Sequence, residues 1–186
     1  MATLRIPIHE NDHSQGPGDA PVTLVEYGDY QCPYCGAAYP VVQRLQRRFG
    51  DELRFVFRNF PLAEHHPEAV SAAITAEFGA AHARFWEVHD ALYESQEELG
   101  GPLYDAIVTG LGLDAPELHE AIEAEEYAEK IRDDFNGGVR SGVNGTPAFF
   151  VNGVRYDGRP DFESLEETLA RALGAAKSGR SGASRR

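Results

Sequence analysis

The sequence predicts a single α/β domain with a central mixed β-sheet and a helical insertion between the second strand and a C-terminal hairpin. One observation is the order of its apolar patterns: strand, helix, strand, a block of helices, then two short strands and a helix. Another is the first strand–helix–strand connection, which is long enough for the crossover that parallel strands require. The length of 186 residues fits one domain that carries an insertion.

The first half of the chain contains the two strands that are predicted to be parallel. Residues 22–27 form a short, β-rich apolar run that is typical of a buried strand. The helix that follows is expected to run to about Phe49, because Gly50 is suited to end a helix. Residues 53–60 place apolar side chains at alternate positions, which predicts a second strand.

The second half returns to the sheet after a long helical block. Residues 148–151 and 154–156 are β-rich and flank the pair Asn152 and Gly153. This pair favours a two-residue hairpin turn, because both residues tolerate positive φ. Asp161 is a predicted N-cap for the last helix.

The predicted organisation is a sheet domain in two pieces around an inserted subdomain. The parts are an N-terminal arm (residues 1–21), the sheet domain (22–63 and 140–176), an inserted helical subdomain (64–139) and a disordered basic tail (177–186). The arm is polar and contains Gly and Pro breakers, which predicts a loosely held segment. The tail is rich in Ser, Gly and Arg, a composition that is typical of disorder.

Composition and charge exclude several classes of protein and partner. Hydrophobic residues make up 42% of the chain and charged residues 25%, as in an ordinary globular protein. With a formal net charge of −13, the surface repels phosphate groups, so nucleic acid and anionic membranes are not expected partners. No apolar run approaches the ~20 residues of a membrane span. Residues 1–21 show no apolar leader segment and no small-residue cleavage site, which predicts a cytoplasmic protein, or a periplasmic or exported one if a leader has been removed.

The two cysteines of the chain, Cys32 and Cys35, lie in a Cys-Pro-Tyr-Cys segment at the predicted start of a helix. Here unpaired backbone N–H groups and the helix dipole stabilise a thiolate, so the pKa of the first thiol falls. Two cysteines at this spacing can form a strained disulfide, and a stabilised thiolate makes that disulfide a stronger oxidant. Pro33 suits the first helical turn, and Pro33 and Tyr34 flank the sulfurs and are expected to tune their redox potential.

Half of a zinc site is the structural alternative for this motif. A structural zinc ion needs about four ligands, so two cysteines cannot complete a site. The histidines that would have to be recruited are His9, His13, His65 and His66. No metal is predicted, because a Cys-x-x-Cys motif beside a strand–helix–strand pattern is more typical of redox chemistry.

Three segments, in the same order along the chain, resemble the DsbA-like branch of the thioredoxin superfamily. They are VTLVEYGDYQCPYCGAAYP at residues 22–40, FWEVHDALYESQ at residues 85–96 and NGTPAFFVNG at residues 144–153. The resemblance implies a thioredoxin-like fold, with the helical insertion before a cis-proline hairpin. It also implies a thiol–disulfide oxidoreductase that exchanges a disulfide with protein substrates.

The same resemblance implies roles for individual residues. Cys32 is the expected nucleophile and Cys35 the resolving thiol. Glu26 stands where the family often has a buried acid, and it is expected to accept the Cys35 proton with a raised pKa. Thr146 and Pro147 are expected to form a cis peptide bond beside the disulfide and to bind substrate.

Other functions of the same fold remain open at this point. One is a glutathione-dependent transferase or isomerase, although those relatives usually replace the first cysteine by serine. Another is a non-enzymatic peptide- or metal-binding module that uses the cysteines as soft ligands. The leading interpretation requires no cofactor, and it implies a monomer whose partners are protein thiols or disulfides and a thiol redox partner for recycling. The net direction, as oxidase, reductase or isomerase, stays open, but Pro-Tyr in place of the Pro-His of the branch's familiar periplasmic oxidase predicts a weaker oxidant.

Overall fold

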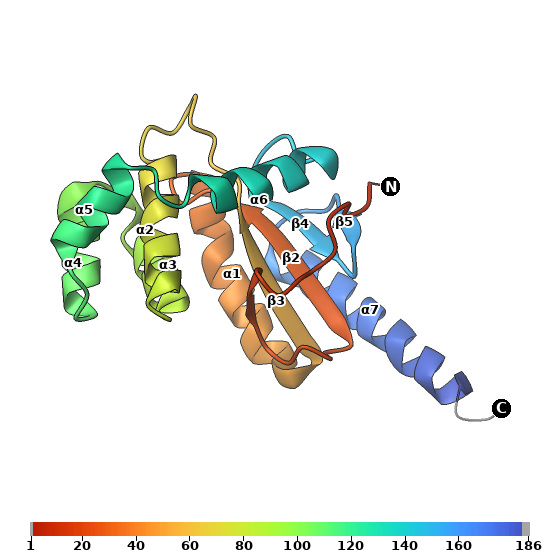
Figure 1. Cartoon of the computed structure of the whole chain (residues 1–186). Coiled ribbons are helices and arrows are strands. Elements are labelled where there is room, and N and C mark those ends of the chain that lie inside the picture. Colours follow the sequence, from red (N-terminus) through yellow and green to blue (C-terminus); the bar gives the residue numbers. More distant parts are fainter. Residues whose placement is uncertain (1, 184–186) are drawn as a thin grey trace.

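The protein folds around a mixed sheet, as the sequence predicts, with five strands where four were expected. The computed structural model describes residues 2–183 (Figure 1). The strands are β1 (His13–Gln15), β2 (Val22–Gly28), β3 (Leu53–Asn59), β4 (Ala148–Val151) and β5 (Val154–Tyr156). Their order across the sheet is β1-β3-β2-β4-β5, in which β2 and β3 are parallel and the other neighbours are antiparallel. The predicted α/β class and mixed sheet are therefore confirmed.

Helices connect and cover these strands. They are α1 (Pro33–Phe49), α2 (Ala69–Ala81), α3 (Phe85–Glu94), α4 (Gly101–Gly110), α5 (Ala115–Glu123), α6 (Ala128–Arg140) and α7 (Phe162–Ala183), with the short 3-10 helices η1 (Gly50–Glu52) and η2 (Gln96–Glu98). Helix α1 supplies the crossover between β2 and β3. Helices α2 to α6 come between β3 and β4 in the sequence, and Figure 1 shows α2 to α5 to one side of the sheet while α6 returns toward β4.

Side-chain alternation along the central strands divides the core into two layers. On β2, Leu24 and Glu26 share one face, and Val25 and Tyr27 point to the other. The layer that contains Leu24 packs α1, α3 and α7 against the sheet, whereas the layer that contains Val25 is covered by the N-terminal segment and α6. Glu26 therefore lies on the face that α1 covers, which is also the face of the two cysteines.

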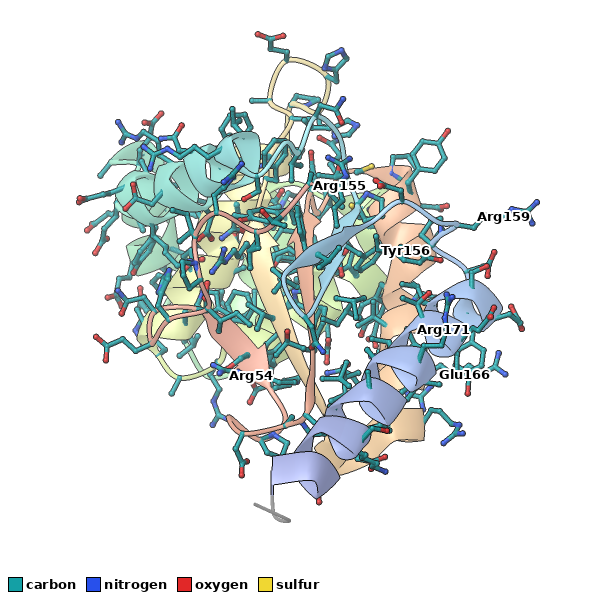
Figure 2. The ribbon with its side chains drawn as sticks, turned by 90° about the vertical axis from the view of Figure 1, so that its right-hand side faces the viewer. Arg54, Arg155, Tyr156, Arg159, Glu166 and Arg171 are labelled. Atoms are coloured by element: carbon teal, nitrogen blue, oxygen red, sulfur yellow. The ribbon has the colours of Figure 1, made fainter. Side chains whose placement is uncertain are left out.

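Helices α1 and α7 lie next to each other on this first face. Figure 2 shows α7 crossing below β5, with Glu166 on its outer surface. Arg48 of α1 lies 3.4 Å from the Glu166 carboxylate, and the Arg44 guanidinium stacks 3.6 Å from the centroid of the Phe162 ring. These contacts join the first and the last helix of the sheet domain.

Three local sequence signals act at the positions where they were predicted. Gly50 ends α1 with a φ of 51°. Asn152 and Gly153 have φ values of 47° and 78°, which is the positive φ that a tight hairpin turn needs. The Asp161 carboxylate accepts a hydrogen bond of 2.8 Å from the Ser164 backbone N–H and so caps α7.

The N-terminal arm is held more firmly than the sequence indicates. Strand β1 pairs with β3 and forms one edge of the sheet. The buried Asp12 carboxylate accepts two hydrogen bonds of 2.8 Å from the buried Arg58 guanidinium. The remaining Arg58 donors reach the carbonyl oxygens of Ile6 and Pro7 and the hydroxyl of Tyr27. The prediction of a loosely held arm is wrong, because a buried arginine needs partners and the arm supplies them.

The C-terminal tail also differs from its prediction. Helix α7 continues through Ala183, which contradicts a disordered segment that starts at Lys177. The Lys177 ammonium lies 2.6 Å from the Glu52 carboxylate of η1. Glycine and serine have low helix propensity, but these residues extend a helix that is already formed, and propagation costs less than nucleation. Residues 184–186 of the predicted tail lie outside the described residues.

Within residues 2–183, no helix has the length and apolar character needed to cross a membrane.

Candidate redox site

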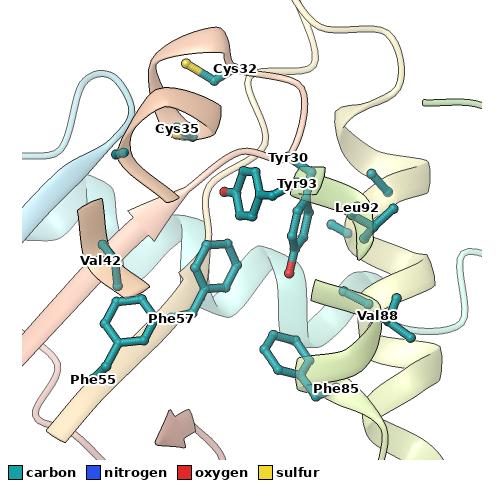
Figure 3. Close-up of a cluster of buried hydrophobic side chains, with 14 of the residues drawn as sticks. Tyr30, Cys32, Cys35, Val42, Phe55, Phe57, Phe85, Val88, Leu92 and Tyr93 are labelled. Atoms are coloured by element: carbon teal, nitrogen blue, oxygen red, sulfur yellow. The ribbon is translucent and has the colours of Figure 1, made fainter. Parts of the chain in front are cut away.

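Cys32 and Cys35 lie at the start of α1, where the parallel strands end. Cys32 is the N-cap residue, and Cys35 lies one turn further into the helix (Figure 3). Both residues are free thiols. Cys35 is fully buried in the hydrophobic cluster, whereas Cys32 keeps an exposed fraction of 3%. Both side chains are therefore largely shielded from water, and only Cys32 keeps a small exposed area.

The pKa of Cys32 is lowered to about 5. The largest cause is a hydrogen bond that the Cys35 thiol donates to the Cys32 sulfur. Hydrogen bonds from the backbone N–H groups of Cys35 and Tyr34 lower it further, and together these bonds outweigh the desolvation that raises it. At neutral pH the Cys32 sulfur is therefore a thiolate, which is the nucleophilic form.

The pKa values of Cys35 and Glu26 are shifted in the opposite direction, upward. Burial raises the pKa of the Cys35 thiol well above its ordinary value, and its hydrogen bond to Cys32 and the nearby Glu26 charge raise it further. Burial also raises the pKa of the Glu26 carboxyl to about 8, and a Cys32 thiolate adds to this shift. A carboxyl that titrates near neutral pH is suited to accept and return a proton.

The loop before β4 reaches the cysteines from a distant part of the sequence. The peptide bond between Thr146 and Pro147 is cis. The Cys32 sulfur lies 3.4 Å from the Thr146 carbonyl oxygen, to which the protonated thiol can donate a hydrogen bond. Both loop residues are half-buried. The structure thus places Thr146 of this loop directly against Cys32.

Pro33 and Tyr34 occupy the first turn of α1 between the two cysteines. Pro33 is the first residue of the helix, where a backbone N–H has no partner within the helix. Tyr34 is 73% exposed, so its ring is open to solvent.

Sequence reasoning missed Asp29, which organises the turn before Cys32. The buried Asp29 carboxylate accepts hydrogen bonds of 2.8 Å from the backbone N–H groups of Gln31 and Leu62, and it lies 2.7 Å from the Nδ1 atom of His66. The Asp29 backbone N–H donates to the Cys35 sulfur at 3.5 Å. The available signal was an acidic residue between a buried strand and the cysteines.

Sequence reasoning also missed Gln96, which joins the insertion to the redox turn. The Gln96 side-chain amide donates hydrogen bonds to the carbonyl oxygens of Tyr30 at 2.7 Å and Cys32 at 2.9 Å. A Cβ atom at Gly36 would stand 2.2 Å from the Gln96 side chain, so this close approach requires glycine. The available signal was its position at the end of the FWEVHDALYESQ segment.

The histidines considered as zinc ligands have other surroundings. His13 lies 2.9 Å from Glu77, His66 lies 2.7 Å from Asp29, and His65 is exposed. Within residues 2–183, no group of three or more His, Cys, Asp or Glu side chains is arranged to hold a metal ion.

Comparison with known proteins agrees with this geometry. A family model described as "Thioredoxin" matches residues 9–171. The chain belongs to the thioredoxin family. Among solved structures, this thioredoxin-family chain is similar to BdbD from Bacillus subtilis, with 25% identity and a TM-score of 0.83 over 93% of this chain and 98% of that one.

Two further structures extend the comparison. A thioredoxin-like oxidoreductase from Silicibacter pomeroyi is 28% identical, with a TM-score of 0.77 over 88% of this chain and 93% of that one. The α-DsbA1 of Wolbachia pipientis shares the fold at 20% identity, with a TM-score of 0.81 over 95% of this chain and 97% of that one. Together these findings place the chain in the thioredoxin family, with a fold that is similar to that of a DsbA protein.

The curated relatives that match this thioredoxin-family chain include proteins named as Na(+)/H(+) antiporters. A Na(+)/H(+) antiporter NhaA 1 of Salinispora arenicola is 39% identical over 175 residues, which are 94% of this chain and 27% of the relative. A Na(+)/H(+) antiporter NhaA of Nitrosospira multiformis is 40% identical over 167 residues, which are 88% of this chain and 26% of the relative. This chain therefore corresponds to a minor part of the length of these relatives.

Proposed function

We propose that this protein is a thiol–disulfide oxidoreductase that exchanges a Cys32–Cys35 disulfide with the cysteines of protein substrates. The observation that carries the proposal is the opposite tuning of the two sulfurs: the pKa of Cys32 is lowered to about 5, and that of Cys35 is raised. One sulfur is thus a thiolate while its neighbour keeps its proton for a later step, which suits exchange through a mixed disulfide. The similar oxidoreductase from Silicibacter pomeroyi supports the same chemistry.

In the oxidising direction, a substrate thiolate attacks the Cys32 sulfur of the disulfide. A bond forms between the substrate sulfur and Cys32, the Cys32–Cys35 bond breaks, and Cys35 takes a proton from the Glu26 carboxyl. A second substrate thiolate then attacks the substrate sulfur of the mixed disulfide, and Cys32 leaves as a thiolate. The substrate has lost two electrons and the protein has gained two. The low pKa of Cys32 makes it a good leaving group.

In the reducing direction, the same steps run backwards. The Cys32 thiolate attacks a substrate disulfide, and one substrate sulfur leaves. Cys35 then gives its proton to the Glu26 carboxylate and attacks Cys32, which releases the second substrate sulfur. Because the pKa of Glu26 is about 8, this carboxyl can hold the proton in one direction and accept it in the other.

Thr146 and Pro147 form the surface that we propose for the substrate. The Thr146 carbonyl oxygen lies against the Cys32 sulfur, so a segment that docks along this loop passes directly over the nucleophile. Pro147 has no backbone N–H, so it offers no hydrogen-bond donor that would compete with the substrate for the Cys32 sulfur. The exposed ring of Tyr34 borders the same thiol and is available for apolar contact.

Equilibration with glutathione buffers of graded redox potential tests the function. The thiol state is measured by alkylation and mass spectrometry. The proposal expects one two-electron transition in which Cys32 and Cys35 are oxidised together, and the Cys35→Ser variant is the control that cannot form this bond. A wild-type protein that forms no Cys32–Cys35 disulfide at any potential would show the proposal to be wrong. The midpoint separates a reductase, poised near the cytosolic glutathione pool, from an oxidase, poised well above it.

The other two functions predict different results in simple assays. A glutathione-dependent transferase or isomerase turns over a small-molecule substrate with glutathione and does not need Cys35. A metal-binding module holds a metal that a chelator removes, and a peptide-binding module binds without exchanging electrons. The presence of both cysteines, with opposite shifts in pKa, supports the oxidoreductase over these alternatives.

The antiporter relatives support one class of protein substrate within this function. Nearly the whole of this chain matches a segment of a protein named as a Na(+)/H(+) antiporter. A redox domain and a transporter that share one polypeptide in a relative are candidates for interaction when they occur as separate proteins. We therefore propose membrane transport proteins as substrates of this chain. Mass spectrometry of the adducts that the Cys35→Ser variant traps from membranes tests this. A set of adducts without transporters excludes this substrate class and leaves the oxidoreductase function in place.

A further inference from the structure

Tyr93 of α3 carries a buried hydroxyl beside the redox centre that lacks a partner. The residue is 6% exposed, and its hydroxyl has no hydrogen-bond partner among the described residues. Four rings hold the Tyr93 ring at centroid distances between 4.9 and 6.3 Å, namely Tyr30, Tyr39, Phe57 and His89. A buried hydroxyl without a partner is destabilising, and phenylalanine would fill the same space without that penalty. The oxygen therefore needs an explanation other than packing.

The hydroxyl points beneath the turn that carries the cysteines. Figure 3 shows the Tyr93 ring extending from α3 toward the end of β2, below Cys35. A Cβ atom at Gly28, the last residue of β2, would stand 3.0 Å from the Tyr93 oxygen. Gly28 and Glu26 share one face of the strand, because side chains alternate along it. The Tyr93 oxygen thus lies at the strand end that carries Glu26, under the helix that carries Cys35.

The charged and titratable groups that face this hydroxyl belong to the redox site. They are Cys35 of α1, Glu26 of β2, and Asp29 and Tyr30 of the turn between them. Burial, and then the negative charges of these groups, raises the pKa of the Tyr93 hydroxyl well above its ordinary value. His89, which packs edge-on against the ring, is buried and has a pKa lowered to about 3, so it is neutral at physiological pH. Tyr93 is therefore a neutral donor that faces sites of negative charge.

We propose that the Tyr93 hydroxyl is a hydrogen-bond donor for the Cys35 thiolate during resolution of the mixed disulfide. This inference rests on the proposed function and adds a residue of the inserted helices to its second step. In that step Cys35 gives its proton to Glu26, its sulfur bonds to Cys32, and the substrate sulfur leaves as a thiolate. Tyr93 keeps its own proton throughout and stabilises the charge on Cys35 before attack.

The ionised sulfur is the acceptor that Tyr93 lacks when both cysteines are reduced. In that state the Cys35 thiol donates its proton to Cys32, and a neutral sulfur is a weak acceptor. A thiolate accepts strongly, and a small movement that brings the Cys35 sulfur within hydrogen-bonding range of the Tyr93 oxygen gives this hydroxyl the acceptor that it lacks in the reduced structure. The four packed rings keep the hydroxyl beside the site before the charge develops, so little reorganisation is needed to stabilise this step.

Reaction of the reduced protein with dithiobis-nitrobenzoate tests the inference, because it separates the two thiols. Attack by Cys32 releases the first nitrothiobenzoate, and resolution by Cys35 releases the second. In Tyr93→Phe, the second release is expected to slow about tenfold, which corresponds to about 1.4 kcal/mol and is typical of one hydrogen bond to a charged group. Its pH midpoint is expected to rise, because the Cys35 thiolate is less stable. The first release is expected to keep its wild-type rate and pH midpoint.

Tyr39→Phe is the matched control. It removes the hydroxyl from the ring stacked on Tyr93, and that hydroxyl is bonded to Gln43 and Glu94, away from the cysteines. Both releases are expected to be unchanged in this variant, and thermal unfolding of reduced Tyr93→Phe is expected to occur no lower than in the wild type. A wild-type second release in Tyr93→Phe, or equal slowing in Tyr39→Phe, overturns the inference. A wild-type protein with no second release would instead overturn the proposed function.

Discussion

The Cys32 sulfur lies 3.4 Å from the carbonyl oxygen of Thr146, a residue 114 positions further along the chain. This contact brings the start of α1 and the loop before β4 together, although the whole insertion separates them in sequence. The insertion returns to the same place, because Gln96 donates to the carbonyl oxygens of Tyr30 and Cys32. All three segments that carry the family resemblance therefore meet at the first cysteine.

The two thiols are expected to differ sharply toward iodoacetamide. At pH 6, Cys32 is expected to be alkylated first, because its pKa is about 5 and it keeps a small exposed area, whereas Cys35 is fully buried with a raised pKa. Peptide mass mapping after limiting reagent measures the order, and the rate at Cys32 is expected to reach half its maximum near pH 5. Earlier labelling of Cys35 would reverse the assigned roles.

Removal of the second thiol is expected to trap substrates. In Cys35→Ser, the Cys32 thiolate can still attack a substrate disulfide, but no thiol resolves the adduct, so mixed disulfides accumulate. Cys32→Ser is the matched control and is expected to trap none, because the buried Cys35 is protonated. Non-reducing gels of cell extracts compare the two. Identical adduct patterns in both variants contradict the assignment of nucleophile and resolving thiol.

Much of the fold could be predicted because its signals are local. Gly50, Asn152 and Asp161 each act within a few residues of their own position, so a short stretch of sequence contains the whole argument. The docking of the N-terminal arm could not be predicted in this way. It depends on Asp12 and Arg58, which are 46 residues apart, and no periodic pattern links such a pair.

The residues of the candidate site also differ in whether their roles could be predicted from local sequence. Cys32 and Cys35 form a local motif, and their chemistry follows from a helix start. Gln96 is different, because it bonds to backbone carbonyl oxygens, and any residue type at the acceptor position would offer the same group. The role of Tyr93 was also hidden, since an aromatic residue at helical spacing is interpreted as core, and only the fold shows that its oxygen has no partner among the described residues.

Glu26 is expected to make stability depend on pH. Its pKa is about 8 in the folded protein against 4.5 ordinarily, so both states hold the proton below pH 4.5 and stability is unaffected there. Between pH 4.5 and 8 the unfolded state ionises first, so the folded protein loses stability as pH rises. Glu26→Gln removes this loss, and its stability relative to the wild type is expected to grow across that window by on the order of 4 kcal/mol. Urea unfolding at several pH values measures the difference, and a difference that is constant with pH contradicts the raised pKa.

The Asp12–Arg58 pair is expected to matter for stability and not for redox chemistry. Asp12→Ala leaves the Arg58 charge buried without its main partner, and such losses typically cost about 3–5 kcal/mol. Burial alone would raise the pKa of Asp12, but the hydrogen bonds from Arg58 outweigh it and the pKa is lowered, so this stability is lost as pH falls through the folded pKa. Denaturant unfolding measures both effects. The alkylation midpoint of Cys32 serves as the control and is expected to stay near pH 5, because Arg58 lies on the other face of the sheet.

Tyr34→His is expected to make the protein a stronger oxidant. Position 34 is 73% exposed next to Cys32, and its backbone N–H already helps to stabilise the thiolate. A protonated imidazole there adds a positive charge, which lowers the thiol pKa and favours the reduced form. A tenfold shift in the equilibrium with glutathione corresponds to ~30 mV, and a gain of about this size is expected below the histidine pKa of ~6.5. Because the imidazole loses its charge above that pH, the gain is expected to shrink as pH rises to about 8. Tyr34→Phe keeps the ring without adding a charge, so an equal shift in that variant would show that ring contacts, and not charge, set the potential.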